Sequence, residues 1–277
     1  MLIFRNKALF WTEFKESKRF FAGQVCMAGT GDVGDVASGG GAGGGSGGAA
    51  GGSPAGVWPG LPYVAPLGVF LVVTMIEKEL YGLLTKPGAY GVKLLATVAA
   101  LVWFRGAWPR WSSRGLVPAV LLGALGTVVW VLLDSVQRQV LGALNLSDWL
   151  PARAGFQFDL QRMTAGDAVF LGVRFLGLAV VVPLAEELCW RGFLAPWLVN
   201  EDFQRVPAGQ MTATSFCIVL GVFTSMHPEI LAAIVWMSGM NVLWQRTGNV
   251  WACVAAHATT NLLLGIYIVQ TGHWWLW

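Results

Sequence analysis

The chain has 277 residues, of which 55% are hydrophobic and only 12% are charged, and its net charge is +3 at neutral pH. An ordinary soluble domain carries about 25% charged residues, so this composition excludes a typical soluble enzyme. The small net charge gives no electrostatic reason to expect a nucleic-acid partner. Fifteen tryptophans suit the aromatic belts of a membrane interface, so we expect an integral membrane protein with the lipid bilayer as its surroundings.

The first 60 residues divide into two segments by composition. Residues 1–28 mix aromatic residues with lysines and arginines, which is typical of a surface amphipathic helix or of a disordered basic tail. Residues 29–60 are dominated by glycine with alanine and serine. Such a sequence buries too little to offset its backbone entropy, so we expect a flexible linker without a functional site. The transmembrane domain then occupies residues 61–277.

Seven apolar stretches follow, each close to the length of about 17 to 25 residues that a membrane-spanning helix needs. Lys93 falls inside the second stretch, where its side chain could snorkel to the interface, and Pro183 should kink the fourth. A tilted or re-entrant piece at 192–200 would make eight. The sequence therefore predicts an all-α, multi-pass transmembrane helical bundle of about seven to eight spans. The stretches are 61–76, 89–104, 115–133, 168–185, 212–226, 230–245 and 250–269.

The fourth stretch runs into two adjacent glutamates, Glu186 and Glu187, followed by Arg191. Burying an ionisable residue in a bilayer costs roughly 2.5 kcal/mol or more, so such residues mark functional sites by default. On a helix, Glu187 and Arg191 are four positions apart and can form an ion pair. Glu186 points about 100° away and has no cation of its own. We interpret the pair as structural and Glu186 as the group that carries chemistry.

Two later stretches hold possible partners for this carboxylate. Phe223 and His227 lie one helical turn apart, and Pro228 disfavours helical geometry at His227, so a helix should end there. Inside the last span, His257 and Asn261 present polar groups on one helical face. Any one of these residues could simply hydrogen-bond a neighbouring helix, a contact worth about 0.6 to 2 kcal/mol. Four such polar elements in three spans favour a catalytic site.

The motifs Glu-Glu-x-x-x-Arg, Phe-x-x-x-His and His-x-x-x-Asn, in this order, resemble those of the CPBP group of intramembrane proteases. That group includes the type II CAAX prenyl proteases and the bacterial ABI-type proteins. The resemblance covers about 166–277, and this stretch is also similar to the protease portion of exosortase E/protease proteins. It implies a helical membrane fold with the site in an internal cavity. Pro228 departs from the family pattern, in which small residues usually follow the motif histidine. The departure bears on the backbone geometry beside His227 and not on the identity of the motif histidine.

The resemblance also implies roles for the site residues. Hydrolysis of an amide needs a base that takes the proton of water, and the family pattern gives this role to Glu186, with His227 holding the water. The tetrahedral intermediate carries an oxyanion, and a fixed donor aimed at it is worth roughly 3 to 4 kcal/mol. His257 and Asn261 are the residues expected to supply such donors. The expected supporting residues are Glu187, Arg191 and Phe223.

A metal-dependent mechanism would use the same residues. Glu186, His227 and His257 could supply the Glu/His₂ ligand set of a catalytic zinc, although the chain lacks a local His-Glu-x-x-His motif. We expect no metal and no other cofactor, and zinc is the alternative.

Two classes of function stay open. Buried ionisable residues also mark ion pathways, so a non-catalytic immunity or transport protein is the alternative to an enzyme. No pair of similarly interrupted stretches suggests the inverted repeats of a transporter. We therefore favour an intramembrane endopeptidase, located in the bacterial inner membrane, that hydrolyses a peptide bond of a membrane-associated or lipid-modified protein. The expected partners are a membrane protein or lipidated peptide and, by the resemblance, an exosortase system.

Overall fold

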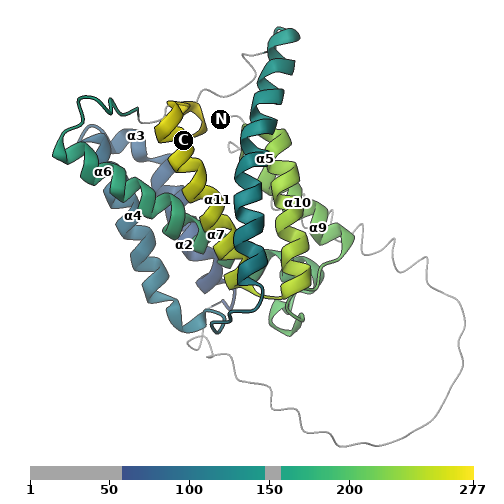
Figure 1. The fold of residues 1–277 in the computed structure, drawn as a ribbon. Coiled ribbons are helices and arrows are strands. Elements are labelled where there is room, and N and C mark those ends of the chain that lie inside the picture. Colours follow the sequence, from purple (N-terminus) through teal and green to yellow (C-terminus); the bar gives the residue numbers. More distant parts are fainter. Residues whose placement is uncertain (1–57, 147–156) are drawn as a thin grey trace, which may run out of the picture. The chain divides into compact units, whose positions relative to one another are not determined.

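The structure is a computed structural model that describes residues 58–146 and 157–277, all of which belong to one compact unit, Ala49–Trp277. The predicted N-terminal segment (1–28) and almost all of the predicted linker (29–60) lie outside the described residues. Within the described ranges all regular structure is helical (Figure 1), which confirms the predicted all-α class.

A helix lies at each of the seven predicted apolar stretches. Shorter helical pieces connect or extend them: α3 (Glu77–Leu80), η1 (Arg105–Ala107), η5 (Phe203–Arg205) and η6 (Trp274–Leu276). The long helices are α2 (Leu61–Met75), α4 (Lys86–Trp103), α5 (Leu116–Ala143), the helix Ala165–Val199, α9 (Ala213–Ser225), α10 (Ile230–Thr247) and α11 (Val250–Thr271).

Three helices in the described part of the chain are long and apolar enough to cross a bilayer by themselves: Leu116–Ala143, Ala165–Val199 and Val250–Thr271. They are the helices expected of a membrane protein. The predicted number of seven to eight spans stays a prediction, because α2 and α9 are apolar but shorter than a full span.

The helix Ala165–Val199 consists of five consecutive pieces: α6 (Ala165–Leu176), the π-helical η3 (Gly177–Val181), α7 (Val182–Cys189), the π-helical η4 (Trp190–Leu194) and α8 (Ala195–Val199). The expected separate piece at 192–200 is therefore wrong, since η4 and α8 continue the same helix. Each π segment is followed two residues later by a proline, Pro183 or Pro196. Proline lacks the N–H for the bond to residue i−4 and clashes with that carbonyl. The wider π turn relieves this conflict without ending the helix.

Close contact between α5 and α11 forms the centre of the bundle. A Cβ atom at Gly123 of α5 would collide with the backbone of Ala256 on α11, so only glycine permits this approach. Thr260 Oγ1 donates to the Gly123 carbonyl across the contact (2.9 Å). Small residues and hydroxyl groups at such crossings are typical of membrane helices, because dispersion contacts and interhelical hydrogen bonds replace the hydrophobic effect there.

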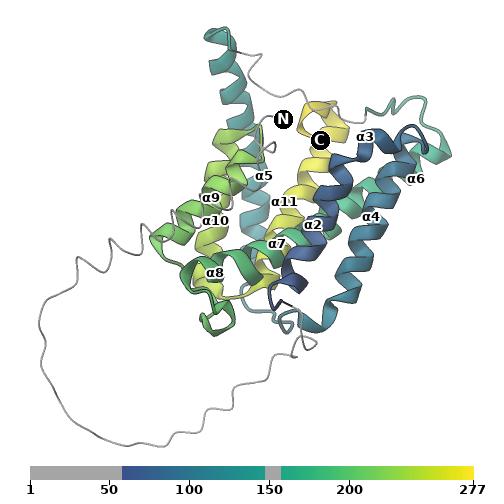
Figure 2. The ribbon, with the colours of Figure 1, turned by 180° about the vertical axis from the view of Figure 1, so that it is seen from behind.

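The side chain of Lys93 does not snorkel as expected. It is 5% exposed, and its Nζ lies 2.7 Å from Glu77 Oε2. The ammonium group also lies over the rings of Phe70 and Tyr90, 5.1 Å from each centroid. Figure 2 shows α2 and α4 side by side, with α3 beside them at one end. The carboxylate of Glu77 and the two aromatic rings give the ammonium group a buried environment, which removes the need to reach the interface.

Candidate active site

Glu186 and Glu187 lie on α7, between the two π segments. Consecutive residues of a helix point in different directions, and here the two carboxylates have different surroundings. Glu187 is fully buried, whereas Glu186 keeps part of its surface accessible. Glu186 Oε2 accepts a hydrogen bond from Trp190 Nε1 at 3.3 Å. π turns inside α-helices occur frequently at functional sites, and two of them enclose this pair.

Glu187 has two polar partners on other turns or helices, Arg191 and His257. It forms the predicted ion pair with Arg191 (Oε2 to Nη1, 2.8 Å), and its Oε1 lies 2.9 Å from His257 Nδ1. Arg191 is itself buried and is held from α10, where Nη2 meets Met237 Sδ at 3.0 Å and Asn241 Oδ1 at 3.4 Å. The sequence predicted the pairing with Arg191 and not the contact with His257. Glu187 therefore fixes the orientation of the His257 ring.

His227 follows the end of α9, as Pro228 predicts. Its Nδ1 lies 2.9 Å from the Phe223 carbonyl oxygen, and because a carbonyl can only accept, the hydrogen is on Nδ1. The ring stacks on Phe223 with centroids 4.1 Å apart and meets Trp130 edge to face at 5.6 Å. The ring is therefore held by a hydrogen bond and by aromatic contacts on two sides, and Nε2 points away from the Phe223 carbonyl.

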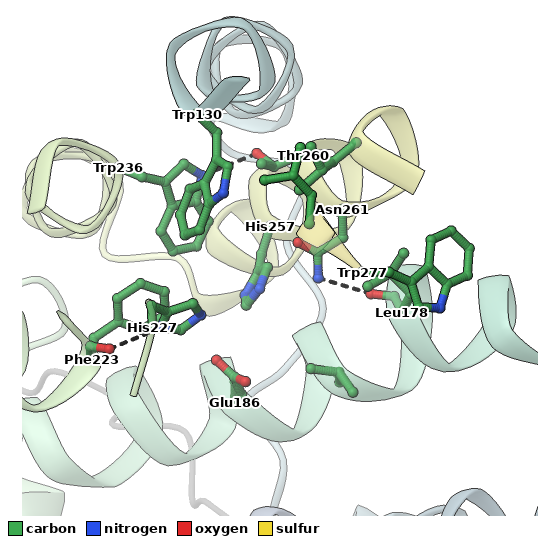
Figure 3. Close-up of a pocket in the computed structure, with 13 residues that line it drawn as sticks. Trp130, Leu178, Glu186, Phe223, His227, Trp236, His257, Thr260, Asn261 and Trp277 are labelled. Carbon is green, nitrogen blue, oxygen red and sulfur yellow. Dashed lines mark hydrogen bonds between the residues drawn. The ribbon is translucent and has the colours of Figure 1, made fainter. Parts of the chain in front are cut away.

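The four predicted catalytic residues line one cavity of about 160 Å³ (Figure 3). They come from three separate helical regions, with Glu186 on α7, His227 after α9, and His257 and Asn261 on α11. A water molecule occupies about 30 Å³ in the liquid, so the cavity has room for several. Phe223 lines it too, whereas Glu187 and Arg191 are not among its lining residues. The structure thus brings together the four side chains that the sequence selected.

Asn261 is anchored by a backbone group that the π turn leaves available. Its Nδ2 donates to the carbonyl oxygen of Leu178 at 2.9 Å (Figure 3). Leu178 lies in η3, where hydrogen bonds run from residue i to i+5, and the residue five positions on is Pro183, which has no N–H. One amide hydrogen of Asn261 is used in this bond, which leaves the second for another acceptor.

Sequence reasoning missed the aromatic wall of the cavity. Trp236 of α10 stacks on Phe223 (5.2 Å) and meets the His257 ring at 4.8 Å, and its Nε1 donates to Thr260 Oγ1 at 3.1 Å. Trp130 of α5 also belongs to this wall. Both lie in the middle of their helices, away from the ends where interfacial tryptophans are expected. Their position in the middle of an apolar helix was the feature of the sequence that could have identified them as site residues.

The remaining lining residues include Leu276 and Trp277, which follow α11. Trp277 packs edge to face on Phe175 with centroids 5.7 Å apart. The guanidinium of Arg174 lies 5.0 Å from the Trp277 ring centroid. These contacts with α6 hold the terminal segment against the cavity.

The fit of the site to a metal ion can be judged from the donor groups. His257 donates its Nδ1–H to a carboxylate, an arrangement that metal-ligating histidines often use. Across 58–146 and 157–277, however, no three His, Cys, Asp or Glu side chains are grouped so that they could hold an ion. Glu186, His227 and His257 share the cavity without forming such a group.

Residues 168–263 match the family model described as type II CAAX prenyl endopeptidase Rce1-like. These residues form an Rce1-like domain. The match covers about a third of the chain and includes Glu186, His227, His257 and Asn261. It confirms the resemblance to the CPBP group and supports protease activity, whereas the link to exosortase proteins stays a prediction. No curated protein and no solved structure matches the chain.

Two parts of the site lie outside the Rce1-like domain. Trp130 belongs to α5, before the first matched residue, and Trp277 follows the last one. The helices that complete the cavity are therefore not all within the matched segment.

Proposed function

We propose that the chain is a multi-pass intramembrane endopeptidase that hydrolyses a peptide bond of a membrane-associated or lipid-modified protein without a metal. The observation that carries this proposal is the convergence of Glu186, His227, His257 and Asn261 on one cavity with aromatic walls. In both histidines Nδ1 is held by an acceptor, so each ring is presented to the cavity in a fixed orientation. Such fixed polar groups are what catalysis of acyl transfer needs.

In the proposed reaction, Glu186 and His227 activate a water molecule. The Glu186 carboxylate takes a proton from the water while the water oxygen attacks the carbonyl carbon of the peptide bond, and His227 Nε2 orients that water. The tetrahedral intermediate then breaks its C–N bond, and the leaving amine receives the proton from Glu186. The products are a carboxylic acid and an amine, and the Glu186 carboxylate is regenerated.

His257 and Asn261 stabilise the oxyanion of the intermediate in this proposal. Asn261 has one Nδ2 hydrogen beyond the bond to Leu178. His257 donates through Nε2 when its ring is protonated, because Nδ1–H is already bound to Glu187. Removing one donor to an oxyanion typically costs about 10²- to 10³-fold in kcat.

The substrate class follows from the surroundings of the site. Apolar and aromatic side chains surround the four polar residues, so the cavity suits a substrate segment that is itself embedded in the membrane. A prenylated protein fits the description of the matching family. A tagged exported protein of an exosortase system is the second expected substrate, and an exosortase encoded beside this chain would favour it. The proposed location is the bacterial inner membrane.

Cleavage by the purified chain tests the proposal. We would present fluorogenic prenylated peptides and single-span membrane proteins to the wild type, to His227→Ala and to His273→Ala. His273 is the matched control, because its ring contacts Tyr267 and Trp275 and does not line the cavity. We expect cleavage by the wild type and His273→Ala only. Equal cleavage by His227→Ala would contradict the proposal.

Two further results would favour the alternatives. Stoichiometric zinc in the active fraction, lost together with activity on chelation and restored with it, would favour a metalloprotease. Ion flux through liposomes that depends on Glu186, with no cleavage of any probe, would favour a transport protein.

A further inference from the structure

The break between α9 and α10 leaves backbone groups without helical partners beside His227. Pro228 follows His227 directly, and Leu231 is the second residue of α10. The N-cap residue of α10, Glu229, makes no capping hydrogen bond with its side chain. In a membrane protein such groups need partners from the protein, because the hydrocarbon core offers no water.

One side chain of α5 binds both sides of this break. Gln137 Nε2 donates to the Pro228 carbonyl oxygen at 2.7 Å, and the Leu231 N–H donates to Gln137 Oε1 at 3.0 Å. Gln137 is 6% exposed, so water does not compete strongly for these bonds. An amide is well suited to this arrangement, since it carries a donor and an acceptor on the same planar group. Gln137 therefore acts as a clamp across residues 228–231.

The same face of α5 also contacts the ring of His227. Trp130 lies seven residues before Gln137, which places both on one side of the helix. The Trp130 ring meets the imidazole edge to face, while Gln137 binds the carbonyl of the next residue, Pro228. Helix α5 thus fixes His227 through its ring and through its backbone. It does so from outside residues 168–263, the Rce1-like domain.

We propose that Gln137 is a positioning residue for His227. It touches no reacting atom. It holds the backbone at Pro228 so that His227 Nδ1–H reaches the Phe223 carbonyl and Nε2 is presented to the cavity. Pro228 makes this support necessary, because it has no N–H to donate to the Thr224 carbonyl and so cannot extend α9. The proposal rests on the proposed function, in which His227 orients the attacking water.

The test compares Gln137→Met with Gln139→Met in the full-length chain. Methionine has the length of glutamine without its hydrogen-bonding groups, and Gln139 is an exposed glutamine on the same helix. The first readout is the tautomer of His227, from ¹⁵N chemical shifts of histidine-labelled protein, with the His227 signal assigned from its loss in His227→Ala. We expect the Nδ1–H tautomer in the wild type and in Gln139→Met, and a mixture of tautomers in Gln137→Met.

The second readout is cleavage of the fluorogenic peptide that the wild type cleaves. We expect kcat of Gln137→Met to fall about 100-fold, the loss that a misplacement of roughly 1 Å can cause. KM should stay within about twofold, because substrate binding is not altered. If Gln137→Met keeps the wild-type tautomer of His227 and the wild-type kcat, the proposal is overturned. This holds also if the variant has a lower melting temperature, because Gln137 then contributes only to stability.

A second variant covers the case in which Gln137→Met does not fold. Gln137→Glu keeps the acceptor for the Leu231 N–H and loses the donor to Pro228, so we expect a smaller shift towards mixed tautomers. An unchanged tautomer in this variant would overturn the proposal. Failure of the proposed function is seen separately, as cleavage that persists in Glu186→Gln or as no cleavage by the wild type. The tautomer readout does not depend on either result.

Discussion

Replacing Glu187 by glutamine should destabilise the protein far more than the same substitution at its neighbour Glu186. Glu187 is fully buried, forms an ion pair with Arg191 (Oε2 to Nη1, 2.8 Å) and lies 2.9 Å from His257 Nδ1 through its Oε1. Glutamine offers one acceptor and one donor, so one of these partners would face an N–H group. Arg191, 2% exposed, would also lose its counter-charge. Removing one partner of a buried ion pair typically costs about 3 to 5 kcal/mol.

The assay is thermal unfolding of the two variants and the wild type in one detergent. For a domain of this size, 1 kcal/mol shifts the melting temperature by about 2 to 4 °C, so Glu187→Gln should lower it by about 6 to 20 °C. Glu186 accepts a bond from Trp190 that the glutamine oxygen can also accept, so Glu186→Gln should change stability by less than about 1 kcal/mol. Equal decreases in the melting temperature of the two variants would refute the assignment of a structural role to Glu187 and a chemical role to Glu186.

Two further predictions concern other buried polar groups. Lys93→Met leaves Glu77 without its cation and should lower the free energy of unfolding by about 3 to 5 kcal/mol, as measured by thermal unfolding. The double variant with Glu77→Gln should recover most of that stability. If the effects of the two substitutions simply add, the pair does not interact. Asn261→Leu removes the donors to Leu178 and to the proposed oxyanion. It should lower kcat by about 10²- to 10³-fold in steady-state kinetics. A kcat close to that of the wild type would exclude Asn261 from the reaction.

The fold could be predicted where apolar runs are uninterrupted, and less well where polar residues interrupt them. The third stretch was expected to end at residue 133, but α5 continues to Ala143. Asp134, Gln137 and Arg138 end the apolar run in the sequence, yet Asp134 and Gln137 are buried with partners far along the chain. Asp134 accepts from Trp275 Nε1, and Gln137 binds the break before α10. Hydropathy cannot reveal such partners, because they come from other helices.

The polar residues of the site could be selected from the sequence because burying polar groups in a membrane-spanning stretch costs free energy. Phe223 could be selected through its spacing from His227, whereas Trp130 and Trp236 add nothing unusual to the hydropathy of their helices and are marked only by their mid-helix positions. The contact between Glu187 and His257 joins α7 to α11 and depends on how these helices pack. The interpretation of Lys93 was wrong for the same reason, since Glu77 is brought to it by the packing of α3 against α4.

The central claim is that the Glu186 carboxylate is the base that activates water, and single-turnover cleavage by Glu186→Gln tests it most directly. The measurement uses the best substrate of the wild type and protein whose melting temperature is confirmed to match. The loss of a general base typically lowers the rate by about 10²- to 10⁴-fold, and this is the result that we predict. A Glu186→Gln rate within a few-fold of the wild type would contradict the claim.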